Sequence, residues 1–213
     1  MLSDERIVSF ISSLEPERSE ILDRIEEEAL ENMVPIVRKD MQSLLRFLVR
    51  TRMPKSILEV GTAVGFSALL MWEASDKKVK ITTIENYDKR IPIARANFDK
   101  AGASEDITLL EGDAFQVLDT IHDTYSFIFM DAAKGQYPSY LPKVTALLEK
   151  GGILVTDNVL QDGDVCESRY AVTRRNRTIH GRMREYLYEL THSDVYETVI
   201  MNVGDGVAIS YKK

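Results

Sequence analysis

Polar residues directly follow two short apolar runs in the second half of the sequence. Asp131 follows residues 127–130, and Asp157 with Asn158 follows residues 153–156. Two carboxylates and one amide oxygen form an all-oxygen ligand set of the kind that Mg²⁺ prefers, with positions left for water and substrate. The pattern predicts a divalent cation site if the two runs are neighbouring parallel strands. The alternative for either aspartate is N-capping of the helix that follows its strand.

A glycine turn follows an earlier apolar run, residues 56–60, and leads into a second apolar stretch. Gly61 and Gly65 lie in this turn, and both would let the backbone approach a ligand closely. The spacing matches neither the G-x-G-x-x-G of dinucleotide enzymes nor a phosphate-binding loop that ends in Gly-Lys-Ser/Thr. We expect a ligand at this strand tip, with Glu59 and Ser67 at the two ends of the loop belonging to its site.

Acidic residues also lie at the tips of the next two predicted strands. Glu85 could accept two hydrogen bonds from a ribose diol. Asp113 could accept a hydrogen bond from an adenine amino group, and Ala114 could supply a backbone amide. The alternative for Glu85 is a solvated acid in a loop, and the Gly-Asp-Ala tripeptide alone would mean little.

Short apolar runs alternate with helical stretches from Pro54 onwards. This alternation predicts a parallel sheet with crossover helices. Gly204-Asp205-Gly206 separates the last two runs and predicts a hairpin turn, so the sheet should end in an antiparallel pair. Before Pro54, helical spacing predicts two amphipathic helices within residues 4–31, broken near Pro16, and a third over residues 40–52. The predicted strands are residues 56–60, 79–84, 107–110, 127–130, 153–156, 196–203 and 207–211.

Length and composition bound the possible classes of protein. With 213 residues and 44% hydrophobic content, the chain can bury one core, and we expect a single domain over 1–213, with a helical cap at 1–53 and a sheet core at 54–213. Cys166 is the one cysteine, the N-terminus carries acids, and no apolar stretch reaches the ~20 residues of a membrane span. We therefore expect a soluble, cytoplasmic protein with no membrane partner.

The order of the three strand tips resembles the class I S-adenosylmethionine methyltransferases. In that class, successive tips hold the methionine, ribose and adenine parts of S-adenosylmethionine. The resemblance implies a Rossmann-like α/β fold with a seven-stranded, mostly parallel sheet, a C-terminal antiparallel hairpin and an N-terminal helical cap. It implies the following cofactor-binding residues: Val37, Glu59, Gly61, Ser67, Glu85, Asp113, Ala114 and Asp131.

The later motifs resemble the cation-dependent O-methyltransferases of the catechol and caffeoyl-coenzyme A type. That family has a metal-binding aspartate after the fourth strand and an Asp-Asn pair after the fifth, which implies Asp131, Asp157 and Asn158 as ligands of Mg²⁺ or another divalent cation. The lysine three residues after the first aspartate, here Lys134, is the implied general base. The cation would lower the pKa of a bound hydroxyl, and Lys134 would accept its proton.

Arginines are concentrated between the fifth predicted strand and the hairpin. Four of them suit phosphate contacts and are the predicted RNA-binding residues, although a solvated helix face is the alternative: Arg174, Arg175, Arg177 and Arg182. The chain is similar to the bacterial tRNA 5-hydroxyuridine methyltransferases, which implies a tRNA anticodon loop as partner, modification of the wobble uridine at position 34, and a homodimer.

Two alternatives to a tRNA methyltransferase stay open. A small-molecule O-methyltransferase could use Tyr137, Tyr140 and Phe66 as an aromatic wall for catechols or acyl-coenzyme A phenolics. A non-catalytic RNA-binding protein could keep the fold without the chemistry.

Overall fold

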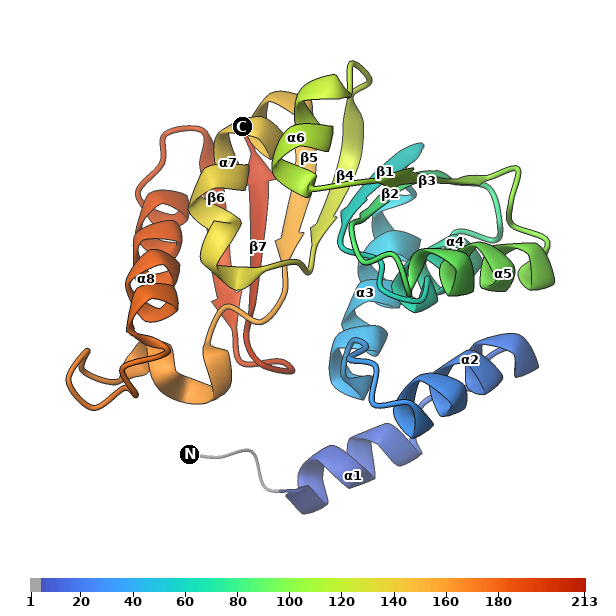
Figure 1. The fold of residues 1–213 in the computed structure, drawn as a ribbon, viewed down its shortest axis with the longest axis horizontal. Helices are drawn as coiled ribbons and strands as arrows, with labels where there is room; N and C mark the ends of the chain where they lie inside the picture. The colour runs from blue at the N-terminus through green and yellow to red at the C-terminus, as the bar shows by residue number, and fades with distance from the viewer. Residues whose placement is uncertain (1–4) are drawn as a thin grey trace.

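The computed structural model describes residues 5–213, which form one seven-stranded sheet with helices on both faces (Figure 1). The strand order is β3-β2-β1-β4-β5-β7-β6. The first five strands are parallel, and β7 pairs antiparallel with both β5 and β6. The predicted class of fold is confirmed. The strands are β1 (Ser56–Val60), β2 (Lys80–Glu85), β3 (Ile107–Glu111), β4 (Tyr125–Met130), β5 (Leu148–Thr156), β6 (Tyr196–Met201) and β7 (Val207–Lys212).

Eight α-helices and three 3₁₀ turns precede or connect the strands within the described part of the chain. The α-helices are α1 (Glu5–Ser13), α2 (Glu20–Glu31), α3 (Lys39–Arg52), α4 (Phe66–Ala74), α5 (Ile91–Ala101), α6 (Ala114–Val117), α7 (Tyr137–Leu147) and α8 (Arg177–Thr191). The 3₁₀ turns are η1 (Leu118–Thr120), η2 (Lys134–Gln136) and η3 (Gln161–Cys166).

Successive residues of the central strands contribute to two separate apolar cores. In β4, Phe127 and Phe129 pack on the side of α2 to α5, whereas Ile128 and Met130 pack on the side of α7 and α8. Side chains alternate between the two faces of a strand, and here both faces are buried, which is why these runs are continuously apolar. The result is a three-layer α/β/α arrangement that exposes the carboxyl ends of the strands at one edge.

The N-terminal helices α2 and α3 are joined by a buried ionic cluster. Glu26 on α2 accepts hydrogen bonds from Arg18, from Lys39 and, at 2.8 Å, from the Gln42 side chain. The side chain of Glu26 is 8% exposed. This cluster fixes the segment between the two helices, residues 32–38, against the sheet domain.

The sheet differs from the predicted one mainly in β4 and β5, which begin earlier than expected. Residues 149–152, which combine two charges with two glycines, lie before the predicted strand 153–156. In the structure Leu148 nevertheless pairs with Tyr125, and an irregularity in register follows between Tyr125 and Phe127. Pairing with β4 therefore overrides the local composition.

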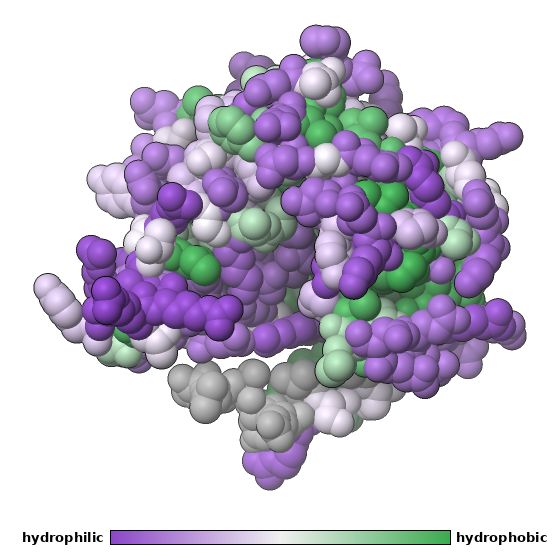
Figure 2. Space-filling model, in the orientation of Figure 1, coloured by the Kyte–Doolittle hydropathy of each residue, from purple (hydrophilic) through white to green (hydrophobic). Residues whose placement is uncertain are grey.

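The surface is mainly hydrophilic, and one face of it has a recess near its centre (Figure 2). Among the residues that the structure describes, no helix is long and apolar enough to span a membrane.

Candidate active site

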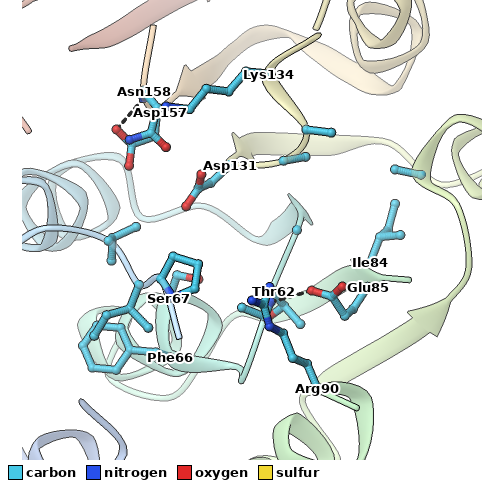
Figure 3. A pocket seen from close by; sticks show the side chains of 18 of the residues that line it. Thr62, Phe66, Ser67, Ile84, Glu85, Arg90, Asp131, Lys134, Asp157 and Asn158 are labelled. Carbon is cyan, nitrogen blue, oxygen red and sulfur yellow. Dashed lines mark hydrogen bonds between the residues drawn. The ribbon is translucent and has the colours of Figure 1, made fainter. Parts of the chain in front are cut away.

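A pocket of about 500 Å³ lies at the carboxyl edge of the parallel strands. Its walls come from the segment before α3 and from the loops after β1, β2, β3, β4 and β5. Figure 3 shows Glu85 and Thr62 at one end of the pocket and Asp131, Asp157, Asn158 and Lys134 at the other. The pocket therefore joins the two groups of residues that the sequence singled out separately.

Gly61 brings the tips of β1 and β4 into contact. Its φ is +95°, and a Cβ at this position would collide with the carbonyl oxygen of Asp131. The backbone N–H of Asp131 in turn donates to Val60 O at 3.0 Å. Only glycine fits this contact, because any other residue would meet both the steric clash and the left-handed backbone. The glycine loop is thus built against the residue predicted to bind the cation.

Glu85 anchors the glycine loop at the tip of β2. Its Oε2 accepts the backbone N–H of Ala63 at 2.8 Å, and its Oε1 accepts the N–H groups of Asn86 and Tyr87, both at 2.9 Å. The side chain also lines the pocket. A carboxylate has about four acceptor positions, so about one remains for a ligand hydroxyl.

Glu59 lies behind the pocket rather than in its lining. It is fully buried, and it accepts hydrogen bonds of 2.5 Å each from the hydroxyls of Ser67 and Thr83. Burial raises its pKa, against the effect of these hydroxyl donors. Ser67 lines the pocket. Glu59 therefore fixes the Ser67 hydroxyl from behind the pocket lining.

Asp113 has a structural role that the sequence did not predict. Its carboxylate accepts the backbone N–H of Phe115 at 2.9 Å and caps α6, and its side chain is exposed. Gly112 and Ala114, on either side, do line the pocket. N-capping, the alternative considered for the other aspartates, thus applies here.

Val37, another predicted cofactor residue, lies in the segment before α3. It is 4% exposed, lines the pocket, and its carbonyl accepts from Gln42 Nε2 at 2.8 Å.

Asp131, Asp157 and Asn158 lie together at the tips of β4 and β5. Met130 and Thr156 are register partners, so the residues that follow them emerge side by side. The backbone N–H of Asp157 donates to Met130 O at 3.0 Å, and Asn158 has a left-handed φ of +59°. Neither aspartate caps a helix, because η2 begins after Ala133 and Asp157 Oδ1 accepts the N–H of Asn158 at 2.7 Å. All three residues line the pocket.

The two aspartates carry negative charge that the protein compensates incompletely. Burial, followed by repulsion from Glu59, raises the pKa of Asp131 to about 6 against the opposing effect of Lys134. Burial, followed by repulsion from Asp131, raises the pKa of Asp157 to about 7. A divalent cation would offset both the cost of burying these carboxylates and their mutual repulsion, so the donor set fits a hard cation.

Asn158 is essential to such a site. No group of three or more His, Cys, Asp or Glu side chains within residues 5–213 is arranged to hold a metal ion. A cation here would depend on two carboxylates and the Asn158 amide oxygen.

Lys134 points toward the acid pair, as Figure 3 shows, and makes an ion pair that the sequence reading missed. Its ammonium lies 3.1 Å from Asp205 Oδ2, and the Asp205 side chain is 3% exposed. Asp205 belongs to the glycine turn before β7, which we expected only to turn the chain. Since β7 runs antiparallel beside β5, its first residues lie at the carboxyl edge of the sheet, and the register Thr156 to Ala208 brings this turn to the pocket.

Arg38 and Asp162 form an ion pair at the outer wall of the pocket. Their side chains, 124 residues apart in sequence, approach to 2.9 Å and are 55% and 79% exposed. Both residues line the pocket. The segment before α3 and the loop after β5 therefore meet across the pocket.

The arginines predicted to bind RNA divide into two groups. Arg177 Nε donates to Val172 O at 3.2 Å, and Arg182 Nη1 donates to Gly135 O at 2.8 Å, so both hold backbone segments. Arg174 and Arg175 are exposed in the loop before α8. A structural role thus accounts for part of the arginine stretch.

The aromatic residues considered as a substrate wall are all buried. Tyr137 is fully buried, donates to Asp157 O at 3.2 Å and packs against Tyr186 with ring centroids 5.5 Å apart. Tyr140 and Phe66 are 3% and 1% exposed and also line the pocket. Tyr137 therefore belongs to the core, whereas the other two face both the core and the pocket.

Taken together, the fold and the pocket define a Rossmann-like group-transfer site, with a glycine loop at one end and an acid-rich cluster at the other. The sequence model of the O-methyltransferase family matches residues 11–213. The chain therefore belongs to the O-methyltransferase family.

Comparisons with individual proteins agree with this assignment. The chain is 32% identical to caffeoyl-CoA O-methyltransferase 1 of Arabidopsis thaliana, over 80% of this chain and 68% of the relative. It is 28% identical to a catechol O-methyltransferase of Niastella koreensis, over 79% of this chain and 78% of the relative. The crystal structure of the Podospora anserina methyltransferase PaMTH1 bound to SAH matches with a TM-score of 0.89 and 26% identity, over 98% of this chain and 94% of that one.

Proposed function

We propose that this chain is an S-adenosylmethionine-dependent O-methyltransferase that methylates one of two neighbouring oxygens on a small aromatic substrate, with a divalent cation held by Asp131, Asp157 and Asn158. The observation that carries the proposal is the meeting of the glycine loop and this acid cluster in one pocket. Family membership and the names of the caffeoyl-CoA and catechol relatives support the substrate class.

The glycine-loop end of the pocket suits the methyl donor. Backbone groups of the loop can approach the methionine part, Glu85 can accept a hydrogen bond from a ribose hydroxyl, and Ala114 can offer its N–H to the adenine edge. The SAH bound to the Podospora relative supports this choice of donor.

The other end of the pocket suits the methyl acceptor. A divalent cation, when bound, supplies Lewis-acid activation of a substrate hydroxyl. Lys134 in its neutral form is positioned to accept the hydroxyl proton. A bond forms between the substrate oxygen and the methyl carbon as the bond from that carbon to sulfur breaks, and Phe66 and Tyr140 help to exclude water from this step.

A methylation assay with a panel of acceptors tests the proposal. Purified protein, S-adenosylmethionine and Mg²⁺ are incubated with catechol, caffeoyl-coenzyme A or coumaroyl-coenzyme A, and products are identified by mass spectrometry. We expect methylation of at least one of the first two acceptors and none of coumaroyl-coenzyme A, which lacks the second adjacent hydroxyl. Loss of activity with chelator and in Asp157→Ala is also expected. Activity that chelation leaves unchanged would contradict the cation-dependent mechanism.

A tRNA bearing 5-hydroxyuridine is the second candidate acceptor. The exposed guanidinium groups of Arg174 and Arg175 favour it, because clustered arginines suit phosphate contacts. The same assay with this tRNA decides between the acceptors, and Arg174→Ala with Arg175→Ala should reduce only tRNA methylation. The predicted homodimer stays a prediction.

A further inference from the structure

We propose that Asp205 is a positioning residue of this active site, which holds Lys134 beside the acid cluster and ties it to the loop that forms the outer wall of the pocket. The inference rests on the proposed function, because Lys134 is the base in that reaction. The family comparisons and the sequence motifs assign no role to Asp205 beyond its turn.

The position of Asp205 is fixed by its backbone. The N–H of Leu160 donates to Asp205 O at 2.9 Å, and the N–H of Val159 donates to Gly206 O at 3.0 Å. Gly206 has a φ of +81°, and a Cβ there would overlap the Leu160 side chain. The turn is therefore pressed against the segment that follows Asp157 and Asn158.

The other side of the same turn is fixed by α3. The N–H of Gly204 donates to Asp40 Oδ2 at 2.6 Å. Asp205 is thus held between two elements, and its carboxylate has little freedom to move away from Lys134.

The two oxygens of the Asp205 carboxylate have different partners. Oδ2 faces the ammonium of Lys134 at 3.1 Å, whereas Oδ1 accepts the backbone N–H of Asp162. The side chain of Asp162 pairs in turn with Arg38. One buried carboxylate therefore connects the base to the outer wall, and a buried carboxylate requires such partners.

Lysine has a long, flexible side chain, and an ammonium free in solution would sample many orientations. The buried Asp205 carboxylate restricts these orientations before substrate binds, because it pairs with the ammonium and can still accept an N–H from the neutral amine. Lys134 is 32% exposed, so the ion pair is the main restraint on its end. Loss of Asp205 should lower the rate of proton removal without weakening cofactor binding.

Chemical labelling of Lys134 tests the restraint without any assay of activity. The chain is treated with an amine-acylating reagent, and the rates at Lys134 and Lys143 are followed by peptide mass spectrometry. In Asp205→Asn, which keeps an oxygen for the Asp162 N–H but removes the charge, we expect labelling of Lys134 to rise about fivefold. Labelling of Lys143, which pairs with Asp119, should not change. Asp119→Asn is the matched control and should affect only Lys143.

Kinetics test the role in the reaction. Asp205→Asn should lower kcat about tenfold or more, as expected for a misplaced base, with the Kd of S-adenosylmethionine within about twofold of the original. In a Lys134→Met background the same change should lower kcat less than about twofold, because residues that act as a unit are not additive. Asp205→Glu, which keeps the charge, should recover part of the loss.

The outcomes separate this inference from the proposed function. Unchanged labelling of Lys134, unchanged kcat, or an equal loss of kcat in both backgrounds would overturn the role of Asp205. If the original chain methylates no acceptor while labelling of Lys134 rises in Asp205→Asn, the proposed function fails and the restraint stands. If Asp205→Asn does not fold, the labelling rates of Lys134 and the exposed Lys78 are compared in the unmodified protein. Equal rates would overturn the proposal, because a restrained Lys134 should react more slowly.

Discussion

The carboxylate of Glu85 accepts the backbone N–H of Ala63 at 2.8 Å and so joins the tip of β2 to the glycine loop after β1. The same carboxylate lines the pocket, which gives it a structural and a ligand-binding role at once. Loss of its charge should therefore affect ligand affinity more strongly than loss of an ordinary surface acid.

Glu85→Gln should weaken S-adenosylmethionine binding by about tenfold to a hundredfold, because hydrogen bonds to a charged group contribute about 1.5–3 kcal/mol. Isothermal titration calorimetry measures the effect. Glu111 is the matched control: it is the register partner of Glu85 on β3, and it is half-exposed and paired with Arg95. Equal affinities of Glu85→Gln and Glu111→Gln would contradict a role in binding.

Gly61→Ala should break the contact between the glycine loop and the tip of β4, and so abolish cofactor binding. The added Cβ would meet the Asp131 carbonyl, and the left-handed backbone adds strain of about 1 kcal/mol or more. Gly102→Ala is the control, because its φ is also positive, at +68°, but nothing lies within 4 Å of the new Cβ. Thermal unfolding should show a larger loss for Gly61→Ala, and similar losses in both variants would rule out the steric argument.

The stability of the cation-free protein should depend on pH through Asp157. Its pKa is raised from 3.8 to about 7, so between these values the folded protein keeps a proton that the unfolded chain has lost. Stability therefore falls as pH rises through this window. In chelator, Asp157→Asn should gain about 4 °C in Tm relative to the original chain between about pH 5 and pH 8. Mg²⁺ should raise the Tm of the original chain at the higher pH and leave the Tm of Asp157→Asn unchanged. A Tm difference between the two proteins that does not depend on pH would refute this.

Glu26→Ala should lower the free energy of unfolding by about 2–3 kcal/mol, because it leaves the buried Arg18 with only the half-exposed Asp23 as anionic partner. The Arg18 side chain is 10% exposed. Urea denaturation measures the loss, and Glu27→Ala, at an exposed neighbouring position, should change stability by less than about 0.5 kcal/mol. Because this cluster fixes the pocket wall before α3, the variant should also bind substrate more weakly.

Most of the site residues that could be predicted from the sequence lie directly after predicted strands. A polar residue after a buried parallel strand has one possible location, the carboxyl edge of the sheet, so Asp131, Asp157 and Glu85 could each be assigned to that edge from their order alone. The antiparallel end of the sheet was predicted too, but not its register. Without the register, Asp205 could be read only as a turn residue.

The direction in which a side chain points explains the other differences between the predicted and the observed roles of site residues. Glu59 precedes the glycine loop by two residues, yet strand alternation turns it away from the pocket and toward Ser67 and Thr83. Asp113 is adjacent to pocket residues but is used to cap α6. Such choices depend on hydrogen-bond partners distant in sequence, as they do for Arg177 and Arg182, whose acceptors are backbone carbonyls.

The meeting of Arg38 and Asp162 has a consequence for how this protein can diversify. The groups proposed for methyl transfer lie on strand tips that the sheet holds in place, whereas the outer wall comes from two segments far apart in the chain. An exposed ion pair contributes only about 0–1 kcal/mol, so either segment can change at little cost to folding. Evolution could therefore exchange the acceptor molecule by altering the rim alone, while the inherited chemistry beneath it stays intact.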